Sequence, residues 1–240
     1  MSTFPSSTEF SRHSENLTAV LATLKQVERA HKRAIKEGDA PSERAMRKVH
    51  TLLLGVFAEA ALRKILTDPT GFNERERHLI WGIRSQVDRW LAAVDFAARR
   101  HYKVLTHQSL DEVLLPQDLL RIQEVNGLLK NDLEPVITDR NRLAHGQWVW
   151  QLTSRSENKF APQSAIYDYN YSALSARFKL LQSIGRLVNA LSVSEPTFDR
   201  DFAALMSQIA NARQELDGHG YPALASQLRR RRTAAHPAAP

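Results

Sequence analysis

The chain has 240 residues, of which 42% are hydrophobic and 25% are charged, as is typical of a globular protein with one substantial core. It contains no cysteine, which excludes disulfides, thiolate zinc sites and thiol nucleophiles. The net charge is +7, and because four arginines stand together at 229–232, the rest of the chain is only mildly basic. Such a balance permits contact with a phosphate backbone but lacks the dense basic surface of a dedicated nucleic-acid-binding protein.

The chain shows no sign of a segment for export or for membrane insertion. No long apolar run follows the N-terminus, and the most apolar window, residues 52–62, is short and contains Glu59. We therefore expect neither a signal peptide nor a membrane-spanning helix, no contact with a membrane, and a cytoplasmic protein.

Apolar residues recur at three- and four-residue steps along most of the chain, which predicts a series of amphipathic helices. These helices are expected over about residues 14–37, 41–67, 74–101, 117–130, 133–145, 172–192 and 198–216. Gly38 ends the first helix, and Asn73 with Glu76 forms a capping box at the start of the third.

Two segments depart from this helical pattern. Alternating Trp and Tyr residues predict a β-hairpin with strands over residues 147–152 and 164–171. We expect these aromatic side chains to cover a hydrophobic core, and stacking on unpaired RNA bases is the alternative. From about residue 223 the Ala- and Pro-rich sequence predicts a disordered basic tail, whose arginines either bind RNA phosphates or are simply solvated.

The fold class expected from these elements is all-α, a helical bundle with a small β-hairpin insertion. We divide the chain into an N-terminal helix, a helical domain and a disordered basic tail, over residues 1–40, 41–217 and 218–240.

The sequence "DRNRLAHG" closes the helix expected over residues 133–145 and gathers three polar side chains at its end. Asn141 and His145 lie four residues apart and therefore share one helix face. Arg140 starts from another face, but its long side chain can reach back along the helix surface. Arginine, asparagine and histidine together suit the binding of a small anionic group such as a phosphate.

Each of these residue types has a distinct task if the phosphate belongs to RNA. An imidazole such as that of His145 can take the proton of a ribose 2′-hydroxyl or return one to the departing 5′-oxygen. Arg140 can stabilise negative charge on the phosphate oxygens, and Asn141 can orient the imidazole or the ribose. The 2′-hydroxyl is already beside the phosphate, so the chemistry requires no metal and no cofactor, and yields a 2′,3′-cyclic phosphate and a 5′-hydroxyl.

Acid and base catalysis normally requires two titrating groups, whereas this motif holds a single histidine. A two-fold homodimer that brings two copies of the motif helix together would supply both groups in one cleft.

The stretch "RNRLAH" resembles the Arg-x4–6-His signature of the HEPN superfamily, in the form in which Asn follows Arg directly. The resemblance covers about residues 45–192 and matches Arg140, Asn141 and His145. It implies a HEPN-like helical bundle, metal-independent endoribonuclease activity and a composite active site across a homodimer. It also implies a role in toxin–antitoxin or antiviral defence systems, in which an antitoxin or regulatory protein would be a partner. HEPN proteins often direct a polar residue of an earlier helix to the site, which makes Glu59 a further catalytic candidate.

Structural alternatives stand beside these assignments. Glu59 lies four residues before Arg63, so the two can form an ordinary ion pair on one helix surface. Arg140 and His145 can complement the C-terminal end of their helix, with Asp132 and Asp139 as ion partners. The chain would then be a non-catalytic helical module that binds RNA or a protein through the same dimer surface.

Overall fold

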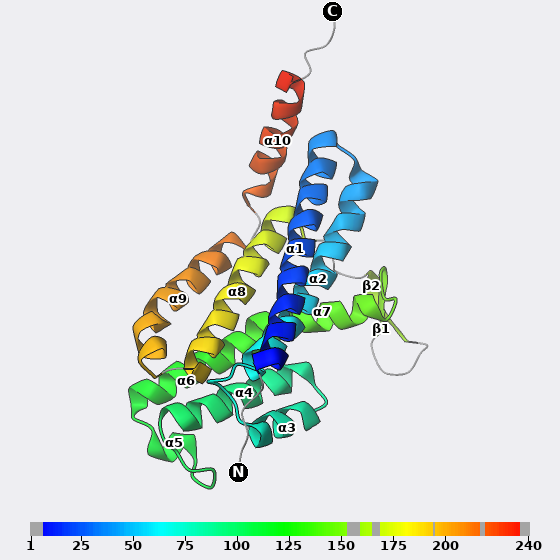
Figure 1. Ribbon diagram of the computed structural model, residues 1–240. Coiled ribbons are helices and arrows are strands. Elements are labelled where there is room, and N and C mark those ends of the chain that lie inside the picture. Colours follow the sequence, from blue (N-terminus) through cyan, green and yellow to red (C-terminus); the bar gives the residue numbers. More distant parts are fainter. Residues whose placement is uncertain (1–6, 153–158, 165–168, 194, 217–218, 236–240) are drawn as a thin grey trace, which may run out of the picture.

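The two longest helices form a hairpin at the N-terminal end of the chain (Figure 1). Helix α1 (Ser7–Glu37) and helix α2 (Ala40–Leu66) match the first two predicted helices, although α1 begins seven residues earlier than expected. Gly38 forms the turn with a positive φ of 73°, a conformation that favours glycine. Asp39 then caps α2 by accepting a hydrogen bond from the Ser42 amide at 3.1 Å.

This is a computed structural model, and it describes residues 7–152, 159–164, 169–193, 195–216 and 219–235. Within these ranges the fold is all-α with one small antiparallel hairpin, which confirms the predicted fold class at this level. None of the described helices combines the length and the apolar character needed to cross a membrane.

The third predicted helix is in fact two helices, α3 (Glu74–Gly82) and α4 (Gln86–His101). The capping box of Asn73 and Glu76 is present as expected. The continuous apolar pattern conceals a break, where the Ser85 side chain caps α4 and the guanidinium of Arg89 donates to the Ile83 carbonyl at 2.7 Å. These polar contacts satisfy the free backbone groups at the break, so the prediction of one unbroken helix was wrong.

A nearly continuous helical rod carries the polar motif. Its elements are α6 (Pro116–Leu128), the π-helical turn η1 (Leu129–Leu133) and α7 (Glu134–Ala144). The short helix α5 (Leu110–Val113) precedes the rod and is separated from it by extended backbone at Leu114 and Leu115. The sequence predicts a gap between residues 130 and 133, but the chain passes through η1 without leaving the helix. Pro135 has no N–H to donate, and a π-helical turn just before it lets the rod continue.

Helix α8 (Tyr171–Val193) runs through the middle of the molecule, and α9 (Glu195–Glu215) packs along it (Figure 1). The main core is formed by fully buried side chains from α1, α2, α4, η1, α8 and α9, among them Leu24, Leu54, Trp90, Leu129, Leu187 and Phe198. Helix α7 contributes Val136 and Ile137 to this core, which fixes the rod against α2.

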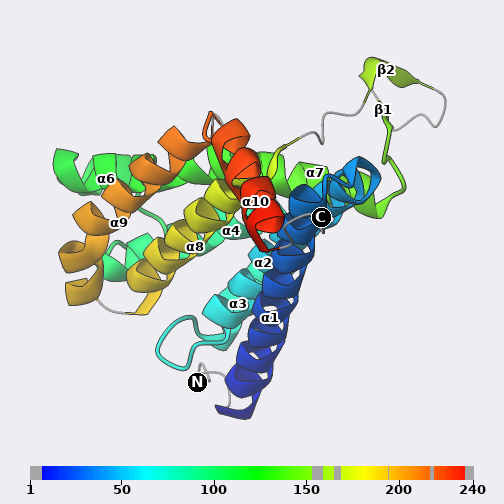
Figure 2. The ribbon, with the colours of Figure 1, turned by 90° about the horizontal axis from the view of Figure 1, so that it is seen from above.

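Strands β1 (Trp150–Leu152) and β2 (Phe160–Ser164) pair antiparallel and project from the bundle beyond the end of α7 (Figure 2). The predicted second strand, residues 164–171, was placed too late in the chain. Tyr167 lies outside the described residues, and Tyr171 is the first residue of α8. The Asn170 side chain accepts from the Ala173 amide at 2.9 Å, and this cap starts the helix.

Residues Tyr221–Ala235 form helix α10, where the composition predicts a disordered tail. The helix packs on a small second core that contains Ile35, Tyr171 and Ala225. The phenol of Tyr221 also donates to the carboxylate of Glu43. Alanine, leucine and arginine all favour helices, and the contacts with α1, α2 and α8 stabilise the helix that these residues form.

Candidate functional site

The motif lies at the C-terminal end of α7, where the sequence places it. Helix α7 ends at Ala144, and His145 is its C-cap residue with φ −95° and ψ 21°. Gly146 follows with a positive φ of 78°, so the chain turns away from the helix axis at this point. Asn141 and His145 are exposed, whereas Arg140 is partly buried against α2.

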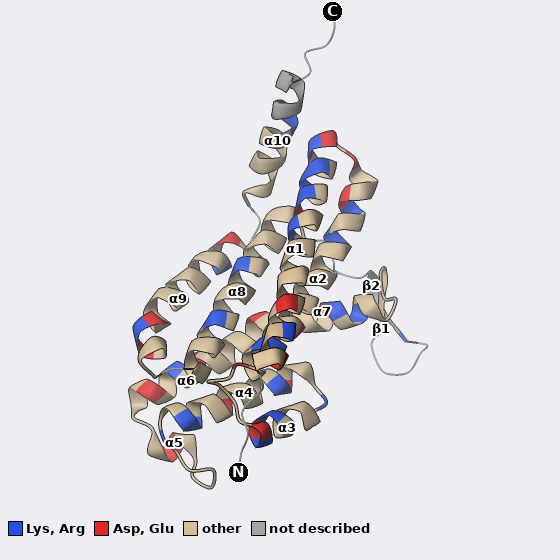
Figure 3. Ribbon diagram, in the orientation of Figure 1, with Lys and Arg blue, Asp and Glu red and all other residues tan. Residues whose placement is uncertain are grey.

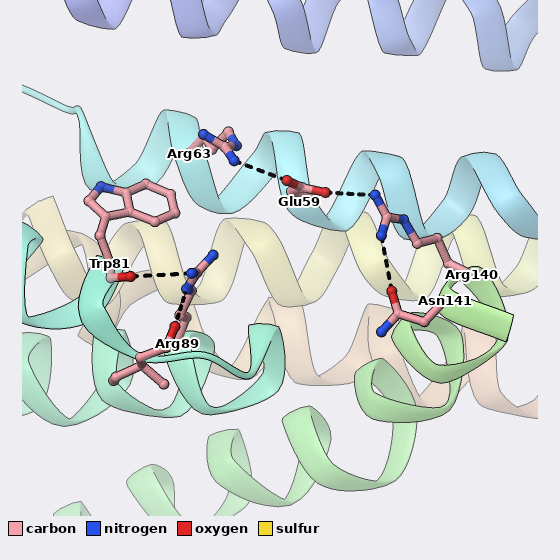
Figure 4. Close-up of polar contacts among 7 residues, drawn as sticks. Glu59, Arg63, Trp81, Arg89, Arg140 and Asn141 are labelled. Atoms are coloured by element: carbon pink, nitrogen blue, oxygen red, sulfur yellow. Dashed lines mark hydrogen bonds and ion pairs between the residues drawn. The ribbon is translucent and has the colours of Figure 1, made fainter. Parts of the chain in front are cut away.

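Arg140 connects three parts of this site (Figure 4). Its Nη2 atom donates to Oε2 of Glu59 at 3.0 Å, and its Nη1 atom donates to Oδ1 of Asn141 at 3.0 Å. Its Nε–H group is buried and has no hydrogen-bond partner among the described residues. The guanidinium is therefore held in place by two oxygen atoms and still has donor capacity, because arginine carries five N–H groups.

Glu59 holds two arginines at once. Its Oε1 atom accepts from Nη2 of Arg63 at 3.0 Å, while its Oε2 atom takes Arg140 (Figure 4). The two sequence interpretations of Glu59, a local pair on α2 and a contact with the motif, are therefore both present in the structure. The Glu59 side chain is 33% exposed, so water screens part of this attraction.

Gly55 makes the approach of α7 to α2 possible, and the sequence analysis missed it. A Cβ atom at position 55 would lie 2.3 Å from Cβ and 2.6 Å from Cγ of Arg140, distances too short for non-bonded carbon atoms. Gly55 stands one helical turn before Glu59, so the absence of a side chain at 55 lets Arg140 reach the carboxylate at 59. A glycine inside an otherwise apolar helix is a sequence signal for such a close contact.

The aspartates that the structural alternative offered as partners bind other side chains. Asp139 is buried, accepts from the phenol of Tyr169 at 3.0 Å and lies 3.9 Å from Nη1 of Arg142. Burial raises the pKa of Asp139, although the hydrogen bond from Tyr169 opposes this shift. Asp132 pairs with Arg213 of α9. Neither carboxylate therefore neutralises Arg140.

The imidazole of His145 is exposed at the end of the helix. Within the described part of the chain, it makes no hydrogen bond or ion pair, with Arg140 and Asn141 or with any other residue. The structure thus brings three of the four candidate residues into direct contact and leaves His145 exposed at the C-cap of the same helix. The described residues also contain no group of three or more His, Asp or Glu side chains placed to hold a metal ion.

Trp81 extends this polar arrangement along the surface (Figure 4). The guanidinium carbons of Arg63 and Arg89 lie 5.0 Å and 5.3 Å from the centre of the Trp81 ring. Arg89 also donates to the carbonyl of Trp81 at 3.2 Å. These cation–π contacts hold Arg63 where it meets Glu59, which in turn limits the freedom of Arg140.

The predicted aromatic hairpin divides into two parts. Tyr169 packs against the main core and Tyr171 is buried, as a core-covering role requires. Trp148 and Trp150 are exposed instead, so the expectation that all these aromatic side chains cover a core was wrong. After Gly146 the chain turns away from the helix axis, so Trp150 lies on the projecting strand β1, whereas Trp148 stays bonded to the end of α7 through its indole Nε1–H and the Leu143 carbonyl.

Comparison with protein-family models, with curated proteins and with solved structures finds no significant match to this chain. The function therefore has to be argued from the site itself.

Proposed function

We propose that the protein is a HEPN-like endoribonuclease that cleaves RNA without a metal ion, through attack of the ribose 2′-hydroxyl on the adjacent phosphate. One observation supports this proposal above the others. The end of α7 gathers Arg140 and Asn141 with Glu59 of α2 through hydrogen bonds of 3.0 Å and leaves His145 exposed at the C-cap of the same helix.

The proposed roles follow from these contacts. His145 removes the proton from the 2′-hydroxyl or returns one to the departing 5′-oxygen. Arg140 donates to the phosphate oxygens as negative charge grows on them. Asn141 accepts from Nη1 of Arg140, and Glu59 accepts from its Nη2 atom. The guanidinium therefore keeps one orientation before the substrate arrives. Glu59 is thus a positioning residue in this mechanism.

The second titrating group comes from a second copy of the chain. A two-fold contact between the exposed ends of two α7 helices would place two His145 imidazoles and two Arg140 guanidiniums around one phosphate. The setting that fits such an enzyme is the cytoplasm, in defence or growth control, with an antitoxin or another regulatory protein to restrain it.

A second candidate function is a non-catalytic helical module that binds RNA or protein. The observation that favours it is the engagement of Arg140 by Glu59 and Asn141, because an arginine in such contacts can simply join α2 to α7. In that role the motif would stabilise the fold and perform no chemistry.

The deciding experiment is RNA cleavage by the purified protein with a chelator present, followed by analysis of the product ends. The proposal predicts a 2′,3′-cyclic phosphate and a 5′-hydroxyl. His145→Ala should lower the cleavage rate about 10²- to 10⁴-fold with unchanged thermal unfolding. His78→Ala, which removes another exposed histidine on α3, is the matched control and should cleave normally. Absence of cleavage by the unmodified chain on varied RNAs would support the non-catalytic module.

Mixing experiments test the shared site. His145→Ala protein replaces unmodified protein in increasing proportion at constant total protein concentration, and the subunits are allowed to exchange. If two copies form one site, activity falls as the square of the unmodified fraction, because mixed dimers lack one imidazole. A linear decrease would show that each chain works alone.

A further inference from the structure

The largest exposed apolar side chains close to the motif belong to the β1–β2 hairpin and the turn before it. Trp148 is 39% exposed, Val149 53%, Trp150 49% and Phe160 59%. We call Trp148, Trp150 and Phe160 the aromatic hairpin surface. Folded proteins seldom leave several large aromatic rings in water within one short segment unless they contact another molecule there.

This surface is attached directly to the last turn of α7. The indole Nε1–H of Trp148 donates to the carbonyl of Leu143 at 2.9 Å, and Leu143 lies between Asn141 and His145 in the chain. The ring is therefore fixed against the helix end that carries the candidate site. A ligand that covers the ring would also pass close to the exposed imidazole.

Basic residues outnumber acidic ones around the aromatic hairpin surface. From position 140 to position 160 the chain carries four basic residues, with Arg140 and Arg142 at the start of that segment, and a single acidic residue, Glu157. The ribbon of Figure 3 is coloured for basic residues at this end of α7. On α2, the ammonium group of Lys48 lies 5.8 Å from the centre of the Trp148 ring. Flat aromatic rings among cations are the combination with which proteins bind unpaired bases and the phosphates that join them.

We propose that the aromatic hairpin surface is a binding site for the bases of single-stranded RNA. The rings stack on unpaired bases and so deliver the neighbouring phosphate to the end of α7. This inference rests on the proposed function, since it names the form of RNA that the site receives. Bases inside a duplex already stack on one another, so paired RNA cannot use the rings.

The test is a binding measurement with a probe that the enzyme cannot cut. A fluorescein-labelled 12-nucleotide 2′-O-methyl oligouridine lacks the free 2′-hydroxyl, and its affinity for the full chain is read by fluorescence anisotropy. Trp150→Ala should weaken binding about 5- to 150-fold, the range that loss of one base stack produces. Trp150→Tyr keeps a flat ring and should keep most of the affinity, whereas Trp150→Leu keeps apolar area without the ring and should not.

Two controls make the measurement specific. Leu115→Ala removes an exposed apolar side chain, 61% accessible, at the N-terminus of α6 and should leave binding unchanged. A blunt-ended 2′-O-methyl RNA duplex, which has no unpaired bases, should bind the unmodified chain and the Trp150→Ala variant equally.

Two results would overturn the inference. The first is equal affinity of the oligouridine for the unmodified chain and Trp150→Ala. The second is a change from dimer to monomer on Trp150→Ala in sedimentation, which would make the surface a contact between copies of the chain. Because the probe cannot be cleaved, these results do not depend on whether ordinary RNA is cut, and the cleavage experiment above judges the proposed function separately.

Discussion

Gly55 of α2 lies directly under the side chain of Arg140 on α7, so closely that a Cβ atom at 55 would be 2.3 Å from the Cβ atom of Arg140. This contact sets the separation of the two helices at the candidate site. It also decides whether Arg140 can meet Glu59, which stands one turn further along α2. The absence of a side chain at Gly55 therefore determines where the Arg140 side chain lies.

Gly55→Ala should push α7 away from α2. Overpacking of this kind costs about 1–3 kcal/mol, against a gain of about 0.5–1 kcal/mol that alanine brings to a helix. We expect a net loss in the free energy of unfolding, measured with urea, and a lower rate of RNA cleavage because Arg140 is displaced.

Gly127→Ala is the matched control for this substitution. Gly127 is also inside a helix, α6, but a Cβ atom there would have no neighbour within 4 Å. This variant should be more stable than the unmodified chain by about 0.5–1 kcal/mol. Equal stability changes of the same sign for the two variants would contradict the close contact at Gly55.

The ion pair of Glu59 and Arg140 should be energetically coupled. Both side chains are about one-third exposed or less, at 33% and 29%, and the 3.0 Å contact joins two helices. A double-mutant cycle with Glu59→Gln and Arg140→Gln should give a coupling free energy of about 1–2 kcal/mol in urea unfolding.

The exposed pair of Lys179 and Glu215 gives the comparison. It also joins two helices, α8 and α9, but its side chains are 55% and 52% exposed. The same cycle there should give about 0.2–1 kcal/mol. If the coupling at Glu59 is no larger than at Lys179, then Glu59 does not hold Arg140 in solution.

Local sequence patterns predicted most of the helices, because the apolar spacing and the capping residues that define a helix lie within one or two turns of each other. Apolar spacing located α2 and α8, and the pair Asn73 and Glu76 gave the start of α3. The break before α4 was hidden, because it depends on how Arg89 meets the Ile83 carbonyl. Helix α10 was missed for a similar reason: its composition suits disorder until Ile35 provides a surface to cover.

The candidate site was predicted in its residue types and only partly in its geometry. The motif spacing placed Arg140 and Asn141 at a helix end, and the lone carboxylate in an apolar stretch pointed to Glu59. The contact between Glu59 and Arg140 spans 81 positions, and nothing local encodes it. Gly55 is the one local residue that this contact requires, but its role can be recognised only when the helix that packs against it is known.

Two buried histidines should make stability depend on pH. His31 and His50 are fully buried, their ring centres are 6.0 Å apart, and their ring nitrogens have no hydrogen-bond partner among the described residues. Burial lowers the pKa of each from 6.5 to about 4. For His31 the nearby Glu43 opposes this shift and Arg47 adds to it, and His31 itself lowers the pKa of His50.

The direction of the effect follows from proton binding. Between pH 6.5 and pH 4 the unfolded chain binds protons at these imidazoles and the folded chain does not, so acid favours unfolding. The contribution of each neutral imidazole to the free energy of unfolding is fully present above pH 6.5 and is lost as the pH falls to 4. The loss is on the order of 3 kcal/mol for one imidazole. Urea midpoints at pH 7.5, 6, 5 and 4 measure this slope.

Substitution of the buried histidines identifies the source of the slope. His31→Phe keeps an aromatic ring against Tyr171 and cannot be protonated, so its midpoint should fall less steeply with acid. His78→Gln removes an exposed histidine and should keep the slope of the unmodified chain. A steep slope that survives in His31→Phe and in His50→Phe would assign the acid sensitivity to other groups.

Helix α10 should open more readily than the rest of the bundle. It is held by the small second core around Ala225 and by polar contacts that include Tyr221 to Glu43 and Arg229 Nε to the Ile35 carbonyl at 3.3 Å. Helices with few buried contacts exchange their amide hydrogens through local opening, whereas central helices need global unfolding. Peptides from α10 should therefore exchange much faster than peptides from α8 in hydrogen-exchange mass spectrometry.

A pair of neighbouring alanines tests which face of α10 holds it in place. Ala225 is buried and Ala223 is exposed. Ala225→Asp puts a charge into the small core and should remove the remaining protection of α10 while leaving that of α8 almost intact. Ala223→Asp carries the same charge on the solvent side and should change neither. If α10 and α8 lose protection together in Ala225→Asp, then α10 unfolds cooperatively with the bundle. The second core would then stabilise the whole bundle and not α10 alone.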